Sequence, residues 1–518
     1  MIIIQRAFMQ RKLASGIIII FGASGDLTAR KLIPAIFSLF SQHIITSKNL
    51  ILGIARSQFS DHSFREKMAK ILSKQYPNQD KKIAAFSAQL FYQPIDDYEN
   101  SHACYQKLQQ RIQNLQQSYS IDNNLLFYLS TPPKLYYEIP AHLASLGMNV
   151  ETEGYKRIIL EKPFGVDEVS ARKLNLHLLN NYQESQLFRI DHYLGKETVQ
   201  NLLAFRFANA IFDPLWNTSH IDNVQIYANE SIGVGQRAGY YEKSGAIRDM
   251  IQNHLLQLLA IVAMEPPSKM DADAIRNETL KVFQSIRHFT TEEAIENNVI
   301  IGQYQQGCIQ GVIKPGYRDE PGVAKDSTTE TYAAIRFFVD NARWHNVPFY
   351  LRTGKRLNQR VSEVVINFKA TPHPFFSQVQ RIIKFKNQLV MRVQPDEGIK
   401  LSFAAKEPGA GFKLHEVDMG FYYSDFAQKA MAPAYERLIL DALEGNNTLF
   451  SRNDAVEACW HITDPILNYL KKHRKRLLQF YPSGSNGPVA ADKMLEEREH
   501  QWRNPSAIFK HNPTQQEQ

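Results

Sequence analysis

The first part of the chain alternates short, continuous apolar runs with stretches in which apolar residues recur at helical spacing. The apolar runs have the length and branching of strands buried on both faces of a parallel sheet, and they cover residues 16–21, 50–56, 90–92, 125–129 and 157–160. Helical spacing indicates helices over residues 27–40, 64–72, 102–115, 135–146 and 169–179. This alternation, with glycine at the first strand–helix turn, predicts a doubly wound α/β domain.

The pattern changes after about residue 200. Longer segments with alternating faces indicate strands over residues 224–229, 364–368, 388–393 and 399–403. No helical pattern interrupts the last three, so we expect them to pair antiparallel. Helices are predicted over residues 247–263, 330–340, 434–443 and 455–472. The second part therefore reads as a large α+β domain with a mostly antiparallel sheet.

The chain has 518 residues, which exceeds the size at which a single hydrophobic core keeps growing. We expect the α/β domain to cover residues 16–200 and the α+β domain to cover residues 201–505. An N-terminal extension over residues 1–15 and a polar tail over residues 506–518 would flank them. Met9 is an alternative start, because the first predicted strand begins only after it.

The composition is that of a folded protein that handles anions. Apolar residues make up 44% of the chain, charged residues 22% and aromatic residues 11%, which excludes a disordered chain. The net charge of +8 favours anionic small molecules and is also compatible with weak nucleic-acid binding. However, the basic residues are spread along the chain, and the one dense run, at residues 471–476, is typical of a helix end. We therefore expect no nucleic-acid partner.

The cysteine content and the hydropathy indicate the compartment. Cys104, Cys308 and Cys459 lie far apart, and none forms a C-x-x-C pair, so a disulfide framework and a zinc cluster are both disfavoured. No apolar run approaches the ~18 residues of a membrane span, and the N-terminus lacks the order of a signal peptide. These features predict a cytoplasmic protein without a membrane partner.

The turn Gly22-Ala23-Ser24-Gly25-Asp26-Leu27 joins the first predicted strand to a helix. Glycine at positions 22 and 25 lets the backbone turn sharply and approach a pyrophosphate, to which the helix N-terminus would present N–H groups. The segment lacks the full G-x-G-x-x-G pattern. A plain strand–helix turn, with Ser24 and Asp26 as N-caps, is the alternative.

Cations surround the position where such folds bind the adenosine ribose. Arg56 ends the second predicted strand, where an NAD site usually places an acid. Arg30 and Lys31 lie early in the first helix. Three cations would favour a 2′-phosphate, and hence NADP, whereas Arg56 as a solvated strand-end residue is the alternative.

Two further segments bring charged and polar side chains together. Lys162, in Glu161-Lys162-Pro163-Phe164-Gly165, follows a predicted strand and so lies at the sheet edge that binds ligands, unless the segment is only a rigid turn. Its Lys–Pro bond is a candidate cis site. The segment 189–197 places Asp191, His192, Tyr193 and Lys196 within six positions. Such groups would hold a sugar phosphate and orient a base; a helix cap with a solvated lysine is the alternative.

A histidine near the start of an apolar helix is the candidate base. Asp249 and Asn253 share a face at spacing i, i+4, and His254 lies one residue further round. An imidazole titrates near neutral pH and can take a hydroxyl proton during hydride transfer, and a carboxylate on its other nitrogen would fix the tautomer. A structural histidine is the alternative. The segment 352–355, with Arg360 after it, would add cations to an anionic site or would be only a surface turn.

These segments, in this order, resemble the glucose-6-phosphate dehydrogenase family. The matching segments are 22–27, 157–165, 189–197, 247–255 and 351–355, and residues 435–441 and 502–505 extend the match. The resemblance covers roughly residues 16 to 505. Ser130-Thr131, before Pro132, departs from a commoner alanine-containing stretch.

The resemblance implies a Rossmann-like coenzyme domain followed by a large antiparallel sheet with helices, usually in a homodimer or homotetramer. It also implies oxidation of glucose 6-phosphate to 6-phosphogluconolactone, the first step of the oxidative pentose phosphate pathway. Hydride would pass from C1 to NADP, and no metal would be needed. A hexose-phosphate dehydrogenase of broader specificity is an alternative. An NADPH-sensing, DNA-binding regulator is another, but no basic recognition helix is found.

The resemblance also implies a role for each matching residue. His254 would be the general base that acts on the C1 hydroxyl, and Asp191 would orient it. The residues expected to hold the phosphate are His192, Tyr193 and Lys196. Those expected at the sugar are Glu230, Asp249, Lys355 and Arg360, with Lys162 between sugar and coenzyme. The residues expected to bind NADP are Gly22, Ala23, Ser24, Gly25, Asp26, Leu27, Lys31 and Arg56, together with Lys162.

Overall fold

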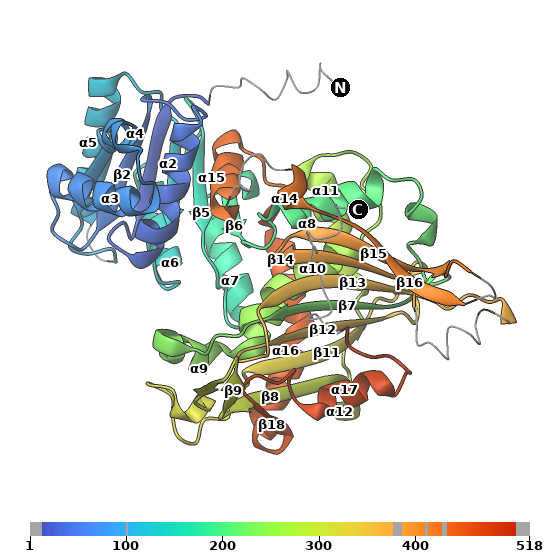
Figure 1. Cartoon of the computed structure of the whole chain (residues 1–518). Helices are drawn as coiled ribbons and strands as arrows, with labels where there is room; N and C mark the ends of the chain where they lie inside the picture. The colour runs from blue at the N-terminus through green and yellow to red at the C-terminus, as the bar shows by residue number, and fades with distance from the viewer. Residues whose placement is uncertain are drawn as a thin grey trace. The chain divides into compact units, whose positions relative to one another are not determined.

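The computed structural model of the protein describes residues 13–99, 102–374, 376, 386–409, 413–426 and 433–503. The start at Met9, most of the predicted N-terminal extension, and the polar tail lie outside these residues. The chain forms two compact units (Figure 1). The described part of the first unit consists of residues 13–195, 267–276 and 433–457, and the second takes the rest. The expected domain limits remain a prediction.

The first unit contains a seven-stranded sheet in the order β17-β6-β5-β4-β1-β2-β3. Its strands are β1 (Gly16–Phe21), β2 (Asn49–Ala55), β3 (Leu90–Pro94), β4 (Leu125–Leu129), β5 (Lys156–Leu160), β6 (Leu187–Ile190) and β17 (Phe450–Ser451). All neighbours pair parallel except β17 with β6. Every residue of β1 is buried, which explains its continuous apolar run.

Helices connect these strands, as the alternating pattern predicts. They are η1 (Thr28–Leu32), α2 (Ile33–Ser41), α3 (Asp61–Gln75), α4 (Asp80–Ser87), α5 (His102–Tyr119), α6 (Leu135–Ser145), α7 (Glu168–Leu179) and the short η2 (Glu184–Gln186). Helix α15 (Ala434–Glu444) joins this unit from much later in the sequence. The predicted α/β fold is confirmed.

The second unit contains a nine-stranded sheet in the order β16-β15-β14-β13-β7-β12-β11-β8-β18. Its strands are β7 (Ile221–Asn229), β8 (Val299–Gln305), β11 (Tyr332–Phe338), β12 (Pro348–Gly354), β13 (Val361–Phe368), β14 (Gln388–Gln394), β15 (Gly398–Lys406), β16 (Leu414–Tyr422) and β18 (Leu478–Pro482). Only the pairs β7–β12 and β8–β18 are parallel among these, so the predicted mostly antiparallel sheet is confirmed. A separate hairpin consists of β9 (Gly307–Ile309) and β10 (Val312–Lys314).

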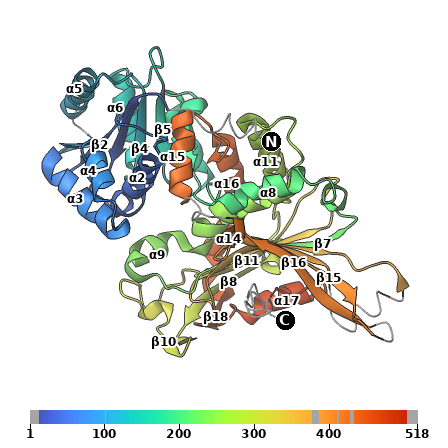
Figure 2. The same ribbon diagram turned by 45° about the horizontal axis from the view of Figure 1, so that its top comes forward.

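Helices lie on both faces of this second sheet, and Figure 2 shows α8 and α17 on opposite sides of it. The helices and helical turns are α8 (Glu197–Phe207), η3 (Asp213–Leu215), η4 (Gly235–Arg237), α9 (Ala238–Ala246), η5 (Ile247–Leu255), α10 (Leu256–Ala263), α12 (Glu292–Asn298), η6 (Tyr317–Asp319), α14 (Tyr423–Phe426) and α17 (Val489–Glu496). Helices α11 (Ala272–Ser285) and α16 (Asn453–Leu477) have residues in both units. No helix among the described residues is long and apolar enough to cross a bilayer.

One predicted element is wrong. Residues 330–340 were expected to form a helix, but they contain strand β11, between β12 and β8. All seven residues of β11 are buried and all except Arg336 are apolar, so the period of two that marks a strand is absent. Strand β6 was not predicted, and neither were β8, β12, β16 and β18 of the second sheet.

Candidate active site

The glycine turn lies at the carboxyl end of β1. Gly22 has φ +85°, and a Cβ there would lie 2.0 Å from the carbonyl oxygen of Ser130, so no larger residue fits this position. Its N–H donates to the carbonyl of Ile54 at 2.8 Å. The turn therefore packs against the carboxyl ends of β2 and β4.

The helix after this turn begins at Asp26 and continues into the π-helical segment η1. Leu27 already has helical dihedral angles. Asp26 pairs with Arg30 at 3.4 Å on the surface and does not cap the helix.

The three cations expected at the adenosine ribose are all exposed. Arg56 is the first residue after β2, and the pairing of Phe21 with Ile54 places it at the same sheet edge as the glycine turn. Arg30 and Lys31 are exposed in the first helix. An exposed guanidinium at this edge is accessible to a phosphate.

Lys162 follows β5, so it lies at the carboxyl edge of the same sheet. The Lys162–Pro163 bond is cis. Gly165 has φ +82°, and a Cβ there would lie 2.5 Å from the backbone nitrogen of Ala171 in α7. The turn is therefore packed tightly between β5 and α7.

Asp191 follows β6 and is only 3% exposed. Its Oδ1 accepts a hydrogen bond of 2.9 Å from the backbone N–H of Tyr193, which fixes the carboxylate. The rings of His192 and Tyr193 meet edge to face at 5.1 Å. The helix-cap interpretation of these residues is wrong, because the N-cap of α8 is Lys196.

The ammonium of Lys196 contacts the Oε1 atom of Gln394, the last residue of β14. The side chain is half-buried, so Lys196 is not a fully solvated surface lysine. Sequence reasoning missed Gln394. Its neighbour Pro395, with a cis bond, was the available signal that this strand end has a special shape.

His254 is fully buried, at 0% exposure, in the π-helical segment η5. A π-helix forms hydrogen bonds from i to i+5, so Asp249 and His254 lie closer to one full turn apart than they would in an α-helix. His254 still lies one residue further round than Asn253, as the sequence predicts. Asp249 is 7% exposed and accepts a 3.2 Å hydrogen bond from the hydroxyl of Tyr240. Burial and then the Asp249 carboxylate raise the pKa of that hydroxyl.

A buried glutamate positions the start of this segment. Gly245 has φ +63°, and a Cβ there would lie 2.2 Å from Oε1 of Glu330. The backbone carbonyl of Glu330 accepts from the N–H of Ala246 at 3.0 Å, and its carboxylate pairs with Arg474 at 3.3 Å. Glu330 lies just before β11, so the sheet holds the N-terminus of the π-helical segment.

Glu230 and Lys355 follow the neighbouring parallel strands β7 and β12, which pair at Asn229 and Gly354. The Lys355 ammonium lies 2.5 Å from Oε2 of Glu230 and 4.8 Å from the ring centroid of Tyr241. A sugar hydroxyl could hydrogen-bond to both members of this pair. These two predicted residues are therefore brought together.

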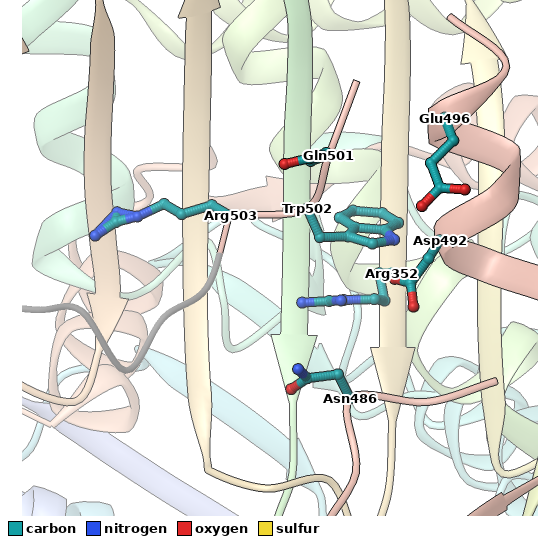
Figure 3. A pocket seen from close by; sticks show the side chains of 7 residues that line it. All are labelled: Arg352, Asn486, Asp492, Glu496, Gln501, Trp502 and Arg503. Carbon is teal, nitrogen blue, oxygen red and sulfur yellow. The ribbon is translucent and has the colours of Figure 1, made fainter. Parts of the chain in front are cut away.

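Arg352 and Arg360 have different surroundings from Lys355. Arg352 belongs to β12, is 1% exposed, and stacks on Trp502 at 4.3 Å, so the surface-turn interpretation of this segment is wrong. Figure 3 shows Arg352 beneath the Trp502 indole, with Asp492 beside it. These residues line a cavity of about 230 Å³. Arg360 is exposed and lines another cavity, of about 330 Å³, with Lys314.

The C-terminal segment is held on the sheet near Trp502 by a buried histidine. Nδ1 of His500 lies 2.9 Å from the Tyr350 hydroxyl, and Nε2 lies 3.3 Å from Oδ2 of Asp222. Lys386 also pairs with Asp222 at 3.0 Å. Burial alone would raise the pKa of Asp222, but the hydrogen bonds and charges of His500 and Lys386 lower it to about 2.

Replacing Asp222 by Asn is expected to lower the free energy of unfolding by about 2 kcal/mol at neutral pH, given 1.36 kcal/mol per pKa unit. A lowered carboxyl pKa stabilises the fold above the unfolded value of 3.8 and loses that effect as pH falls toward about 2. The difference between wild type and Asp222→Asn should therefore shrink over this window in urea titrations. Asp326→Asn, at an exposed carboxylate, is the control; a constant difference would contradict the assignment.

Comparison with known proteins identifies the family. The model of the glucose-6-phosphate dehydrogenase NAD binding domain matches residues 19–201, and the model of its C-terminal domain matches residues 203–503. A glucose-6-phosphate 1-dehydrogenase of Aggregatibacter actinomycetemcomitans is 49% identical over 493 residues, which cover 95% of this chain and 98% of that protein. One from Treponema pallidum is 45% identical and covers 96% of each chain.

Solved structures agree with this result. A glucose-6-phosphate dehydrogenase in complex with its substrate glucose-6-phosphate superposes with a TM-score of 0.87 at 34% identity, covering 96% of this chain and all of that one. The glucose-6-phosphate 1-dehydrogenase of Mycobacterium avium has a TM-score of 0.79 at 32% identity, covering 95% of this chain and 99% of that one. The resemblance read from the motifs is confirmed, and the chain belongs to the glucose-6-phosphate dehydrogenase family.

Proposed function

We propose that the protein oxidises glucose 6-phosphate at C1 to 6-phosphogluconolactone, with transfer of the hydride to NADP. The observation that carries the proposal is the signature segment: Asp191 is buried and held by the Tyr193 N–H, in a chain that matches both domains of the family. The solved relative named above contains glucose-6-phosphate as its substrate.

We assign the proton transfer to His254, which takes the C1 hydroxyl proton as hydride leaves, and its orientation to Asp191. The burial of His254 supports this role, because an imidazole shielded from water keeps a fixed orientation. Asp191 is a positioning residue, since a buried carboxylate on the second ring nitrogen selects the tautomer that accepts a proton.

We assign the phosphate to His192, Tyr193 and Lys196, whose hydroxyl and N–H groups can donate to phosphate oxygens. The sugar hydroxyls would meet the Glu230–Lys355 pair and Asp249. Arg360 would lie at the same pocket, and Lys162 would lie between sugar and coenzyme.

The coenzyme is a nicotinamide dinucleotide, as the family's NAD binding domain indicates. When bound, it accepts the hydride. We propose that the turn from Gly22 to Leu27 holds its pyrophosphate; the turn itself requires glycine, because a Cβ at Gly22 would lie 2.0 Å from the carbonyl oxygen of Ser130. We propose that the coenzyme is NADP, held at its 2′-phosphate by Lys31 and Arg56. We also propose a homodimer or homotetramer, to be measured by light scattering, in the cytoplasm.

Absorbance at the NADPH band tests the proposal directly. The purified protein should reduce NADP with glucose 6-phosphate and should be much slower with free glucose. Mannose 6-phosphate and galactose 6-phosphate should be slow as well; comparable rates would favour the broader hexose-phosphate dehydrogenase. No reduction of either coenzyme with glucose 6-phosphate would refute the proposal.

Lys196→Ala is expected to raise KM for glucose 6-phosphate by about 10- to 100-fold, because a charge-assisted hydrogen bond is worth roughly 1.5–3 kcal/mol. KM for the coenzyme should change little. The measurement compares kcat/KM for glucose 6-phosphate with that for free glucose. Lys173→Ala removes an exposed lysine of α7 as a control. An equal loss on both sugars would mean that Lys196 does not bind the phosphate.

A further inference from the structure

The carboxyl group of Glu161 lies among three tyrosines from three other elements. The hydroxyl of Tyr128, in β4, lies 2.5 Å from Oε1 of Glu161. The hydroxyl of Tyr435, in α15, also hydrogen-bonds to this carboxyl group, and that of Tyr136, in α6, hydrogen-bonds to the backbone of Glu161. Glu161 directly precedes Lys162 in the sequence.

Glu161 also lies beside the signature segment. Strands β5 and β6 pair in parallel, with Leu160 opposite Arg189, so the residues after them come to the same sheet edge. The charge of Asp191 acts on both Glu161 and Tyr435. Glu161 therefore lies between the turn that carries Lys162 and the strand end that carries Asp191.

Helix α15 is fixed to the same two segments. A Cβ at Gly195, the end of the signature in this unit, would lie 2.8 Å from Cγ of Leu438. Arg157, in β5, donates from Nη1 to the carbonyl of Ala442 at 2.7 Å. The helix that supplies Tyr435 is thus held on one side by β5 and on the other by the signature segment.

The carboxyl of Glu161 and the carboxylate of Asp191 are close enough to influence each other. Burial is the main cause that raises the pKa of Glu161, and Asp191 raises it further. Hydrogen bonds from Tyr128 and Tyr435, and the charge of Lys162, oppose the shift without reversing it.

We propose that Glu161 is a positioning residue of the dehydrogenase reaction: its carboxyl group, clamped by Tyr128 and Tyr435, fixes the turn that carries Lys162 beside the strand end that carries Asp191. The inference rests on the proposed function, because it concerns the same reaction. Its role is indirect, since it acts through Lys162 and Asp191.

Steady-state kinetics of Glu161→Gln, Glu161→Ala and Tyr435→Phe, from pH 6 to pH 10, test the proposal. Glu161→Ala should lower kcat about 10- to 100-fold, while KM for the coenzyme changes less than threefold. Glu161→Gln should lose less than fivefold in kcat, since the amide keeps an oxygen that accepts a hydrogen bond from a tyrosine hydroxyl. Tyr435→Phe, which removes one hydroxyl of the clamp, should fall between them. Glu66→Gln, at an exposed carboxylate of α3, is the matched control.

Rescue by the conservative variant separates positioning from a merely structural role. A kcat of Glu161→Gln as low as that of Glu161→Ala would overturn the proposal. Wild-type kcat in both Glu161→Ala and Tyr435→Phe would overturn it too. If Glu161→Ala does not fold, Tyr435→Phe and Glu161→Gln still decide. Inactivity of the wild type would refute the proposed function instead.

Discussion

Replacing His254 by Asn is expected to lower kcat by about 10²–10⁴-fold, or roughly 3–5 kcal/mol, because general-base catalysis typically contributes that much. Asn keeps a hydrogen-bonding side chain of similar reach but cannot take a proton. Binding of sugar and coenzyme should stay largely intact, since neither depends on the proton transfer. The measurement is kcat with saturating glucose 6-phosphate and NADP, together with sugar affinity by equilibrium titration.

Two further variants control this result. His43→Asn changes an exposed histidine at φ +61°, a conformation that Asn tolerates, so it should leave kcat unchanged. Asp191→Asn should lose less than His254→Asn, because Asp191 orients the base and does not react. A near-normal kcat in His254→Asn would show that another group is the base.

Replacing Arg56 by Ala is expected to weaken NADP by about 10- to 100-fold and to leave NAD nearly unaffected. A guanidinium can hold the 2′-phosphate with two hydrogen bonds, each charge-assisted bond being worth roughly 1.5–3 kcal/mol. NAD has no phosphate at this position. The first residue after β2 is where dinucleotide folds contact the adenosine ribose, and here it is an exposed cation.

The quantity to measure is the ratio of kcat/KM with NADP to kcat/KM with NAD, in both proteins. Arg172→Ala removes an exposed arginine of α7 and should leave the ratio unchanged. If the ratio is also unchanged in Arg56→Ala, Arg30 or Lys31 binds the 2′-phosphate instead. Ala variants at those positions would then lower the ratio.

The sequence alone predicted the elements whose pattern is local. The run Gly16–Phe21 is apolar throughout because β1 is buried on both faces, and the glycine after it marks the turn. The segment Arg189–Glu197 was recognisable because several reactive groups stand within a few positions. The sequence therefore predicts which side chains are candidates for the chemistry of the site.

Other features depended on contacts between segments that are far apart in the sequence. The buried strand Tyr332–Phe338 showed no period of two, since neighbours cover both of its faces, and a helix was predicted there. The π-helical backbone over Ile247–Leu255 has no signal in residue spacing. Its start is fixed by packing of Glu330 against Gly245.

Tertiary structure also decided which residues support the site. Tyr435 stands more than two hundred residues after Glu161, and no pattern along the chain indicates that α15 packs beside β5. The same holds for Gln394 beside Lys196 and for Trp502 over Arg352. Local sequence determines a helix or strand through backbone preference and hydrophobic period. The elements that pack against it are determined by packing and hydrogen bonding in three dimensions, which only the folded chain provides.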